Sequence, residues 1–257
     1  VPINLADGGF DMQALEPQAT RYIEVYRGAN ALRYGNSTLG GAINFVSATG
    51  RDAPPLAVRV EAGSFDYRRA QVAVAGRKDA VDAYASLSHF EQEGFREHAA
   101  QRTGRFFGNV GVQLSPAIES RFYLAAVDTD SELPGSLTMA QLRDDPRQAN
   151  AGSAARDQKR DFTLYRLANK TVIAGDHGAR TELSAYAARK RLSHPIFNFL
   201  EQKNRDFGLG ARHNFFTHVG GREQENTVGL SWRRGITEDQ QFTYADTTLP
   251  FTPPHAR

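Results

Sequence analysis

The sequence predicts an all-β fold in which about nine antiparallel strands form part of a transmembrane β-barrel. Three observations lead to this prediction. Apolar and polar residues alternate with period two along most of the chain, as in strands with one apolar and one polar face. Short turns alternate with long polar connections. No apolar run approaches the roughly 18 residues that a membrane-spanning helix requires, so a helical membrane protein is excluded.

The composition narrows the possible functions. The 257-residue chain contains no cysteine, which excludes disulfides, thiolate metal sites and cysteine nucleophiles. Its net charge of +2 argues against a nucleic-acid binder, because such proteins concentrate basic charge on one face. The first residues have neither the basic nor the apolar region of a signal peptide, so we expect the natural N-terminus to lie elsewhere.

Residues 1–50 form a region of their own, with two short strands and several glycines. The segment 21–28 is predicted as a short strand, 29–35 as a single helical turn at most, and 42–46 as a second strand. Four glycines between positions 28 and 41 predict tight turns with positive φ.

Nine segments beyond this region alternate as strands do. Val228, Leu230 and Trp232, for example, alternate with polar neighbours, which gives that strand one apolar and one polar face. The strands are predicted at 56–62, 68–75, 81–88, 106–114, 119–127, 161–172, 180–190, 206–215 and 227–233. The residues expected on the convex, lipid-facing side include Phe106, Val110, Val112, Leu114, Val228, Leu230 and Trp232.

The connections sort by length. Short, turn-like links follow every second strand, at 76–79, 115–118, 175–178 and 218–221. Long polar links follow most of the others, at about 91–103, 128–160 and 191–205, and only 64–67 is short. Turns at one edge and long loops at the other are typical of an outer-membrane barrel. A soluble β-sandwich or propeller has less reason to sort its loops in this way.

The number of strands indicates a fragment. Bacterial single-chain barrels have an even number of strands, and an open nine-stranded sheet would leave two unpaired edges in lipid. We therefore expect this chain to be part of a longer protein that is cut at both ends.

The run IEVYRGANALRYGNSTLGGAINFVSATG, at 23–50, resembles the end of the plug domain in TonB-dependent receptors. The matching positions are Glu24, Arg27, Gly28, Tyr34, Gly35, Gly40, Gly41, Ile43 and Asn44. Ala29 departs from the family, which often has proline there. The resemblance implies that residues 1–50 are the C-terminal part of a plug domain. Residues 51–257 would be the N-terminal part of a barrel of about 22 strands.

Two further segments resemble the outer loops of ferric-citrate-type receptors. They are the loop at 94–99 and the loop that contains 132–138 and 145–148. The resemblance implies a ferric chelate as cargo, either ferric citrate or another siderophore, with the iron carried inside the chelate and no cofactor.

Several polar residues are candidates for roles in transport. The resemblance implies that Glu24 and Arg27 belong to a charge cluster that holds the plug against the barrel wall. Arg189, Arg191 and Arg205 flank the predicted fourth outer loop. They either contact lipopolysaccharide phosphates or capture an anionic iron chelate, because arginine offers a bidentate fork to carboxylate.

The plug apex supplies the remaining candidates. Asn36 and Ser37 lie in the loop that faces outward in the family arrangement, so we expect them to close the ligand site from below. Ser37 stands where ferric-citrate receptors carry glutamine, which leaves the exact ligand open.

We expect no catalytic or metal-binding residue. The histidines lack zinc-ligand spacing, 208–210 lacks the third glycine of a dinucleotide motif, and no serine lies in a nucleophile elbow.

The predicted function is active transport of a ferric chelate across the outer membrane of a Gram-negative bacterium, energised through TonB. The TonB box would lie upstream of this chain, and outer-membrane lipid and lipopolysaccharide would surround the barrel. The alternatives are a receptor of the same fold for cobalamin or a glycan, and a soluble β-rich binding protein. The soluble protein would need no continuous apolar belt, which a barrel carries at about 25 Å in height.

Overall fold

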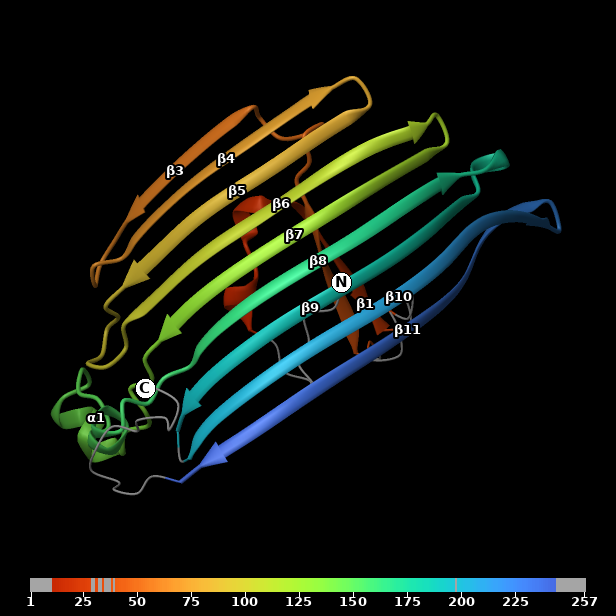
Figure 1. Cartoon of the computed structure of the whole chain (residues 1–257). Coiled ribbons are helices and arrows are strands. Elements are labelled where there is room, and N and C mark those ends of the chain that lie inside the picture. Colours follow the sequence, from red (N-terminus) through yellow and green to blue (C-terminus); the bar gives the residue numbers. More distant parts are fainter. Residues whose placement is uncertain are drawn as a thin grey trace.

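The computed structural model describes residues 11–28, 31, 34, 38, 40–196 and 198–243. Its main feature is a nine-stranded antiparallel sheet in which every strand pairs with its neighbours in sequence (Figure 1). The strands are β3 (Leu56–Ala62), β4 (Arg68–Lys78), β5 (Val81–Gln92), β6 (Gln101–Ser115), β7 (Ile118–Ser131), β8 (Asp161–Ala174), β9 (Arg180–Pro195), β10 (Phe199–Val219) and β11 (Arg222–Phe242). The predicted nine-stranded meander is confirmed.

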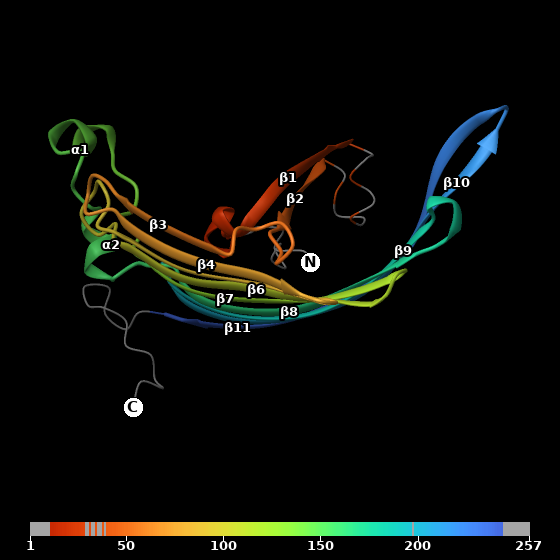
Figure 2. The same ribbon diagram turned by 90° about the horizontal axis from the view of Figure 1, so that it is seen from above.

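The N-terminal region forms a separate two-stranded sheet. Two 3-10 turns, η1 (Met12–Ala14) and η2 (Pro17–Ala19), precede the antiparallel strands β1 (Thr20–Arg27) and β2 (Gly41–Ser47). Figure 2 shows that this hairpin lies on the concave side of the curved large sheet, as expected. The large sheet remains open, with β3 and β11 at its edges.

The alternation of side chains explains the two faces of the sheet. In β5, Asp82, Ser86 and Ser88 are buried on the concave face, whereas Val81 and Leu87 are exposed on the other face. The strand register carries this division across the sheet, so the apolar residues predicted to face lipid all lie on the convex side. Leu230 is the most exposed of them, at 79%.

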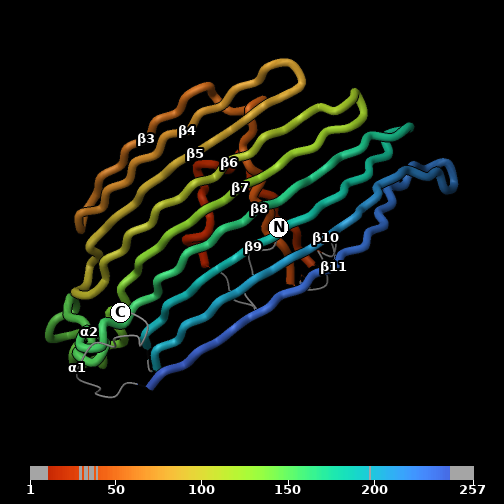
Figure 3. The backbone as a smooth tube through the Cα atoms, in the orientation of Figure 1, coloured from red at the N-terminus to blue at the C-terminus, as the bar shows by residue number. Residues whose placement is uncertain are grey.

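Turns and loops gather at opposite ends of the strands (Figure 3). The inner end has short turns, among them 79–80 and 220–221, whereas the outer end carries 93–100 and 132–160. The long link holds two short helices, α1 (Met139–Asp144) and α2 (Ala151–Ala155). Among the residues that the structure describes, no helix is long and apolar enough to cross a membrane.

One predicted connection is wrong. The segment 191–205 was expected to be a long outer loop, but β9 continues to Pro195 and β10 starts at Phe199, so the link is only 196–198. The sequence is misleading here because both faces of these strand ends carry polar residues. The period-two contrast between apolar and polar positions therefore fades.

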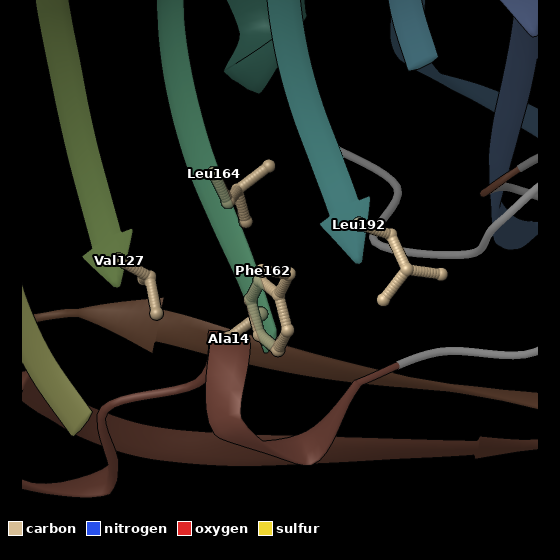
Figure 4. Close-up of a cluster of buried hydrophobic side chains, with 5 residues drawn as sticks. All are labelled: Ala14, Val127, Phe162, Leu164 and Leu192. Atoms are coloured by element: carbon tan, nitrogen blue, oxygen red, sulfur yellow. The ribbon is translucent and has the colours of Figure 1, made fainter. Parts of the chain in front are cut away.

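Small apolar clusters hold the N-terminal turns to the concave face. Ala14 of η1 packs with Val127, Phe162, Leu164 and Leu192 of the wall (Figure 4). Ala19 of η2 forms a second cluster on β4 and β5. These contacts are few, so polar contacts must supply much of the attachment.

Candidate functional site

The first polar contact between the N-terminal segment and the sheet centres on Asp11, which is 7% exposed. Its Oδ1 accepts hydrogen bonds from Arg160 at 2.8 and 3.0 Å, and its Oδ2 pairs with Lys190 of β9. Burial alone would raise the pKa of the Asp11 carboxyl, but Lys190 and Arg160 outweigh it and hold the pKa below its usual value. Asp11 is therefore ionised at neutral pH.

The second contact centres on Glu16, which is 3% exposed. Its carboxylate pairs with Arg69 of β4 and accepts a hydrogen bond from Ser88 of β5. Between the two carboxylates, Arg105 donates to the backbone carbonyl of Gln13 at 2.8 Å. Since these partners come from β4 to β9, the segment 11–19 is tied across most of the concave face.

The third contact lies at the inner end of the sheet, around Asp82. Arg121 of β7 binds both carboxylate oxygens of Asp82, at 2.7 and 2.8 Å. Arg51, which lies in the connection between β2 and β3, donates to Asp82 at 2.7 Å, and the Gly50 amide donates at 3.2 Å. Glu119 balances the second arginine charge, at 2.9 Å from Arg121 and 3.4 Å from Arg51.

The backbone of this connection lies so close to the wall at Gly50 that no side chain fits there. A Cβ on Gly50 would lie 2.2 Å from the Gly76 carbonyl oxygen and 2.5 Å from the backbone of Ala83. Asn109 also donates to the Ala48 carbonyl at 2.8 Å. The connection from the N-terminal hairpin into β3 is thus fixed at the inner edge by charge and by close backbone packing.

Glu24 and Arg27, the predicted latch, lie on β1 of the hairpin. Glu24 accepts hydrogen bonds from Asn44 of β2 at 2.7 Å and from Tyr34 at 3.4 Å. Arg27 is exposed. These two contacts of Glu24 stabilise the hairpin itself, so its contact with the barrel wall stays a prediction. The residues that do reach the wall, such as Asp11 and Glu16, carried no local sequence signal.

The two outer loops that resemble ferric-citrate-type receptors dock on each other. Arg96 donates four hydrogen bonds, to the carbonyl oxygens of Pro134, Gly135 and Gln148, at 2.6 to 3.1 Å. The Glu97 amide adds a 2.7 Å bond to the Arg147 carbonyl. The short loop 93–100 thereby supports the long loop above the sheet.

The same loops bring together three side chains of types that can ligate a metal ion. Ligand atoms of His98, Glu132 and Asp157 lie within 4.8 Å of one another. The Lys159 ammonium, however, lies 3.4 Å from Asp157 and 3.3 Å from Asp161. Although burial lowers the pKa of Lys159, the two aspartates raise it above its usual value, so this charge persists. A cation is already present, and we assign no metal here.

The three arginines predicted to bind the ligand do not lie on the concave face. Arg189 and Arg191 on β9 and Arg205 on β10 are exposed strand residues on the convex face, away from the N-terminal hairpin. The reason is the pleat of the strand, in which successive side chains point to opposite faces. Lys190 therefore points to the concave side, and Arg189 and Arg191 on either side of it point to the convex side. Asn36 and Ser37 lie outside the described residues. The structure therefore gives these arginines no place in a site below the outer loops.

Comparison with known proteins finds a similar sequence and several similar structures. No protein-family model matches the chain. The rhizobactin receptor of Rhizobium meliloti (strain 1021) is 33% identical over 196 residues, which cover 70% of this chain and 24% of that protein.

Solved structures share the fold. The unliganded ferric citrate transporter FecA superimposes with a TM-score of 0.70 at 17% identity, over 87% of this chain and 37% of that one. The ferric-catecholate import receptor Fiu from E. coli K12 gives a TM-score of 0.72 at 14% identity, over 92% and 43%. The chain thus spans about a quarter of the curated relative and about two fifths of these structures.

Proposed function

The chain belongs to the family of TonB-dependent outer-membrane receptors of Gram-negative bacteria, and from this premise we propose that it is part of a receptor that imports a ferric chelate. The observation that carries the proposal is the N-terminal segment tied by buried charges across the polar concave face of an amphipathic sheet. We propose that residues 1–50 are the C-terminal part of the plug and residues 51–257 the N-terminal part of the barrel.

The charged contacts suit a plug that must stay in place and yet move. Ion pairs between plug and wall satisfy charges that would be costly inside the barrel. These ion pairs fix the position of the plug more than they add to its net stability, since the cost of desolvation offsets much of their attraction. A pull on the plug by TonB would have to break contacts such as those of Asp11, Glu16 and Arg51. Water would replace each of these contacts as the lumen opened.

The proposed cargo is ferric citrate or another ferric siderophore, with the iron carried inside the chelate. The relatives named for rhizobactin and for ferric citrate support this cargo class. Asn36 and Ser37 remain our proposed contacts from the plug apex. The exposed apolar convex face supports a membrane barrel over a soluble binding protein.

The test is uptake of radioactive iron by cells that produce the full-length receptor, supplied as ferric citrate or as ferric carboxylate siderophores. We expect saturable uptake of at least one of these chelates, abolished in cells without TonB. Labelled cobalamin and labelled oligosaccharides serve as controls for the other cargoes of this fold. Uptake of either control with no uptake of any ferric chelate would contradict the proposal.

A further inference from the structure

The junction between the long outer loop and β8 lies where the outer loops, the wall and the N-terminal segment meet. It consists of Gln158, Lys159 and Arg160, the last three residues before β8. The hydrogen bonds of these residues lead to the neighbouring loop, to the wall and to the segment 11–19. A change in one of these parts can therefore reach the others through the junction.

Gln158 and Lys159 hold the junction in place on two sides. The Gln158 carbonyl accepts hydrogen bonds from the Leu133 amide at 2.8 Å and from Nε2 of His98 at 3.0 Å. The Lys159 carbonyl accepts a hydrogen bond from Nδ1 of His194 at 2.7 Å. The junction is thus held by the short loop 93–100 on one side and by the outer end of β9 on the other.

Arg160 connects the junction to the N-terminal segment. Its backbone amide donates to the Ser131 carbonyl at 2.8 Å, at the end of β7. Its guanidinium group donates two hydrogen bonds to Oδ1 of Asp11, at 2.8 and 3.0 Å. The base of the long outer loop is therefore in direct contact with the segment 11–19.

Asp11 is held by two cations from different parts of the molecule. Lys190 belongs to β9 and so to the wall, whereas Arg160 lies at the base of a loop. A buried carboxylate depends on its partners, so the position of Asp11 follows theirs. Loss of the Arg160 contact would weaken the hold on Asp11, and Lys190 would keep part of it.

The docking of the two outer loops decides how firmly Arg160 is held. Arg96 holds the short loop to the long loop, and His98 of the same short loop holds Gln158, two residues before Arg160. If the two loops separated, the junction would lose its contact with His98 and Arg160 would lose part of its support. Separated loops would therefore hold the segment 11–19 less firmly than docked loops do.

We propose that Arg160 is a positioning residue that couples the docking of the outer loops to the hold on the segment 11–19. Docked loops keep Arg160 against Asp11, and separated loops loosen this contact. Such a coupling acts equally in both directions, so release of Asp11 also loosens the loops. The proposal rests on the assignment of the segment 11–19 to the plug of the proposed receptor and not on the cargo.

The test is a cycle of two changes in the full-length receptor, held in phospholipid nanodiscs. Arg96→Ala removes the contact that docks the loops, and Arg160→Gln removes the contact with Asp11. Arg160→Lys keeps the charge and is the conservative variant. The matched control is Arg143→Gln, which changes an exposed arginine of α1 in the same long loop. Heat-modifiability on gels shows that each variant is folded.

Hydrogen exchange of the Ala14 amide is measured, because this amide donates to the Asp11 carbonyl at 3.0 Å. We expect Arg160→Gln to raise its exchange on the order of tenfold, as loss of hydrogen bonds to a charged group predicts. Arg96→Ala should raise the exchange about fivefold in the presence of Arg160 and should have no effect in its absence. Arg160→Lys should restore most of the protection, whereas Arg143→Gln should leave the exchange unchanged.

Three results would overturn the proposal. The first is equal exchange of Ala14 in Arg160→Gln and in the wild type. The second is an effect of Arg96→Ala that persists without Arg160, which would show that the loops act on the segment by another route. The third is a parallel rise in the exchange of the segment 48–53, which has its own anchor in the wall, because such a rise would indicate general loosening.

The reciprocal measurement starts from the plug side. Asp11→Asn should raise the exchange of the Glu97 amide, which donates to the Arg147 carbonyl between the docked loops at 2.7 Å. Unchanged exchange of Glu97 would also overturn the coupling. None of these measurements uses a chelate, so a receptor that takes up no ferric chelate would refute the proposed function and leave the exchange results standing.

Discussion

Replacing Asp82 by asparagine should loosen the connection between plug and barrel. Both Asp82 oxygens are engaged by Arg121 and Arg51, and the side chain is fully buried. Asparagine keeps the shape but loses the charge and one acceptor, so an amide N–H₂ would face a guanidinium group. Arg121, which is only 5% exposed, would then rely on Glu119 and Asn109.

The expected magnitude follows from the contacts that remain. Removing one partner of a buried ion pair costs about 3–5 kcal/mol. We expect the lower end, about 3 kcal/mol, because Glu119 stays near both Arg121 and Arg51. Only the Arg51 and Gly50 contacts break when the segment 48–53 opens, because Asp82 and Arg121 both belong to the wall. A hydrogen bond to a charged group contributes about 1.5–3 kcal/mol, so at about 1.4 kcal/mol for each factor of ten the segment should open at least about tenfold more often.

Hydrogen exchange in the full-length receptor measures this opening directly, because the Gly50 amide donates to Asp82. The matched control is Asp66→Asn, whose carboxylate is 61% exposed and 3.7 Å from Arg68. Asparagine also tolerates the positive φ of this residue. Exchange in the control should change by less than about twofold, since exposed pairs contribute little. Unchanged exchange of 48–53 in the Asp82→Asn receptor would refute the role of Asp82 as the anchor.

Three other changes test other parts of the structure. Arg96→Ala should leave the half-buried carbonyls of Gly135 and Gln148 without their side-chain donor, at about 1 kcal/mol each, so trypsin should cut the loop 132–160 faster. The Pro134 carbonyl keeps the hydrogen bond from the Asn150 amide. Equal cleavage would show that the loop holds its shape without Arg96. Leu230→Arg should hinder membrane assembly, because an arginine in the membrane midplane costs about 2–4 kcal/mol, and normal heat-modifiability would contradict the lipid-facing assignment. Lowering the pH should release the segment 11–19 only below the ordinary carboxyl pKa of 3.8. The reason is that the pKa of Asp11 is lower in the folded protein than in the unfolded chain. The stability that ionised Asp11 contributes is therefore complete above pH 3.8 and is lost as the pH falls through the folded pKa. Release near pH 6, followed by proteolysis of the segment, would show that another group controls the contact.

The strands within the membrane could be predicted because lipid and the polar lumen impose opposite demands on alternate residues. Val228, Leu230 and Trp232 alternate with polar neighbours for this reason, and the structure places them on the convex face. The short inner turns were equally clear, since few residues fit them. The outer strand ends could not be predicted in the same way. Beyond the hydrocarbon layer both faces of the sheet contact water, so both can carry polar residues. The strands β9 and β10 therefore continue through a polar sequence that resembles a loop.

The contacts between plug and wall were beyond sequence reasoning for another reason. Asp11 and Lys190 are 179 residues apart, and Glu16 and Arg69 are 53 apart. The chemistry of the lumen requires that such charges be paired, but many carboxylates and many bases satisfy that requirement. Only the register of the strands decides which side chains meet.

The run Arg189-Lys190-Arg191 shows how the pleat decides function. Sequence alone treats the three as one basic cluster at a barrel mouth. In the strand, successive side chains point to opposite faces, so Lys190 turns inward to Asp11 and the two arginines turn outward. One cation therefore helps to hold the plug, while its two neighbours face away from it. A variant of Lys190 should therefore weaken plug docking, whereas variants of the two arginines should leave plug docking unchanged.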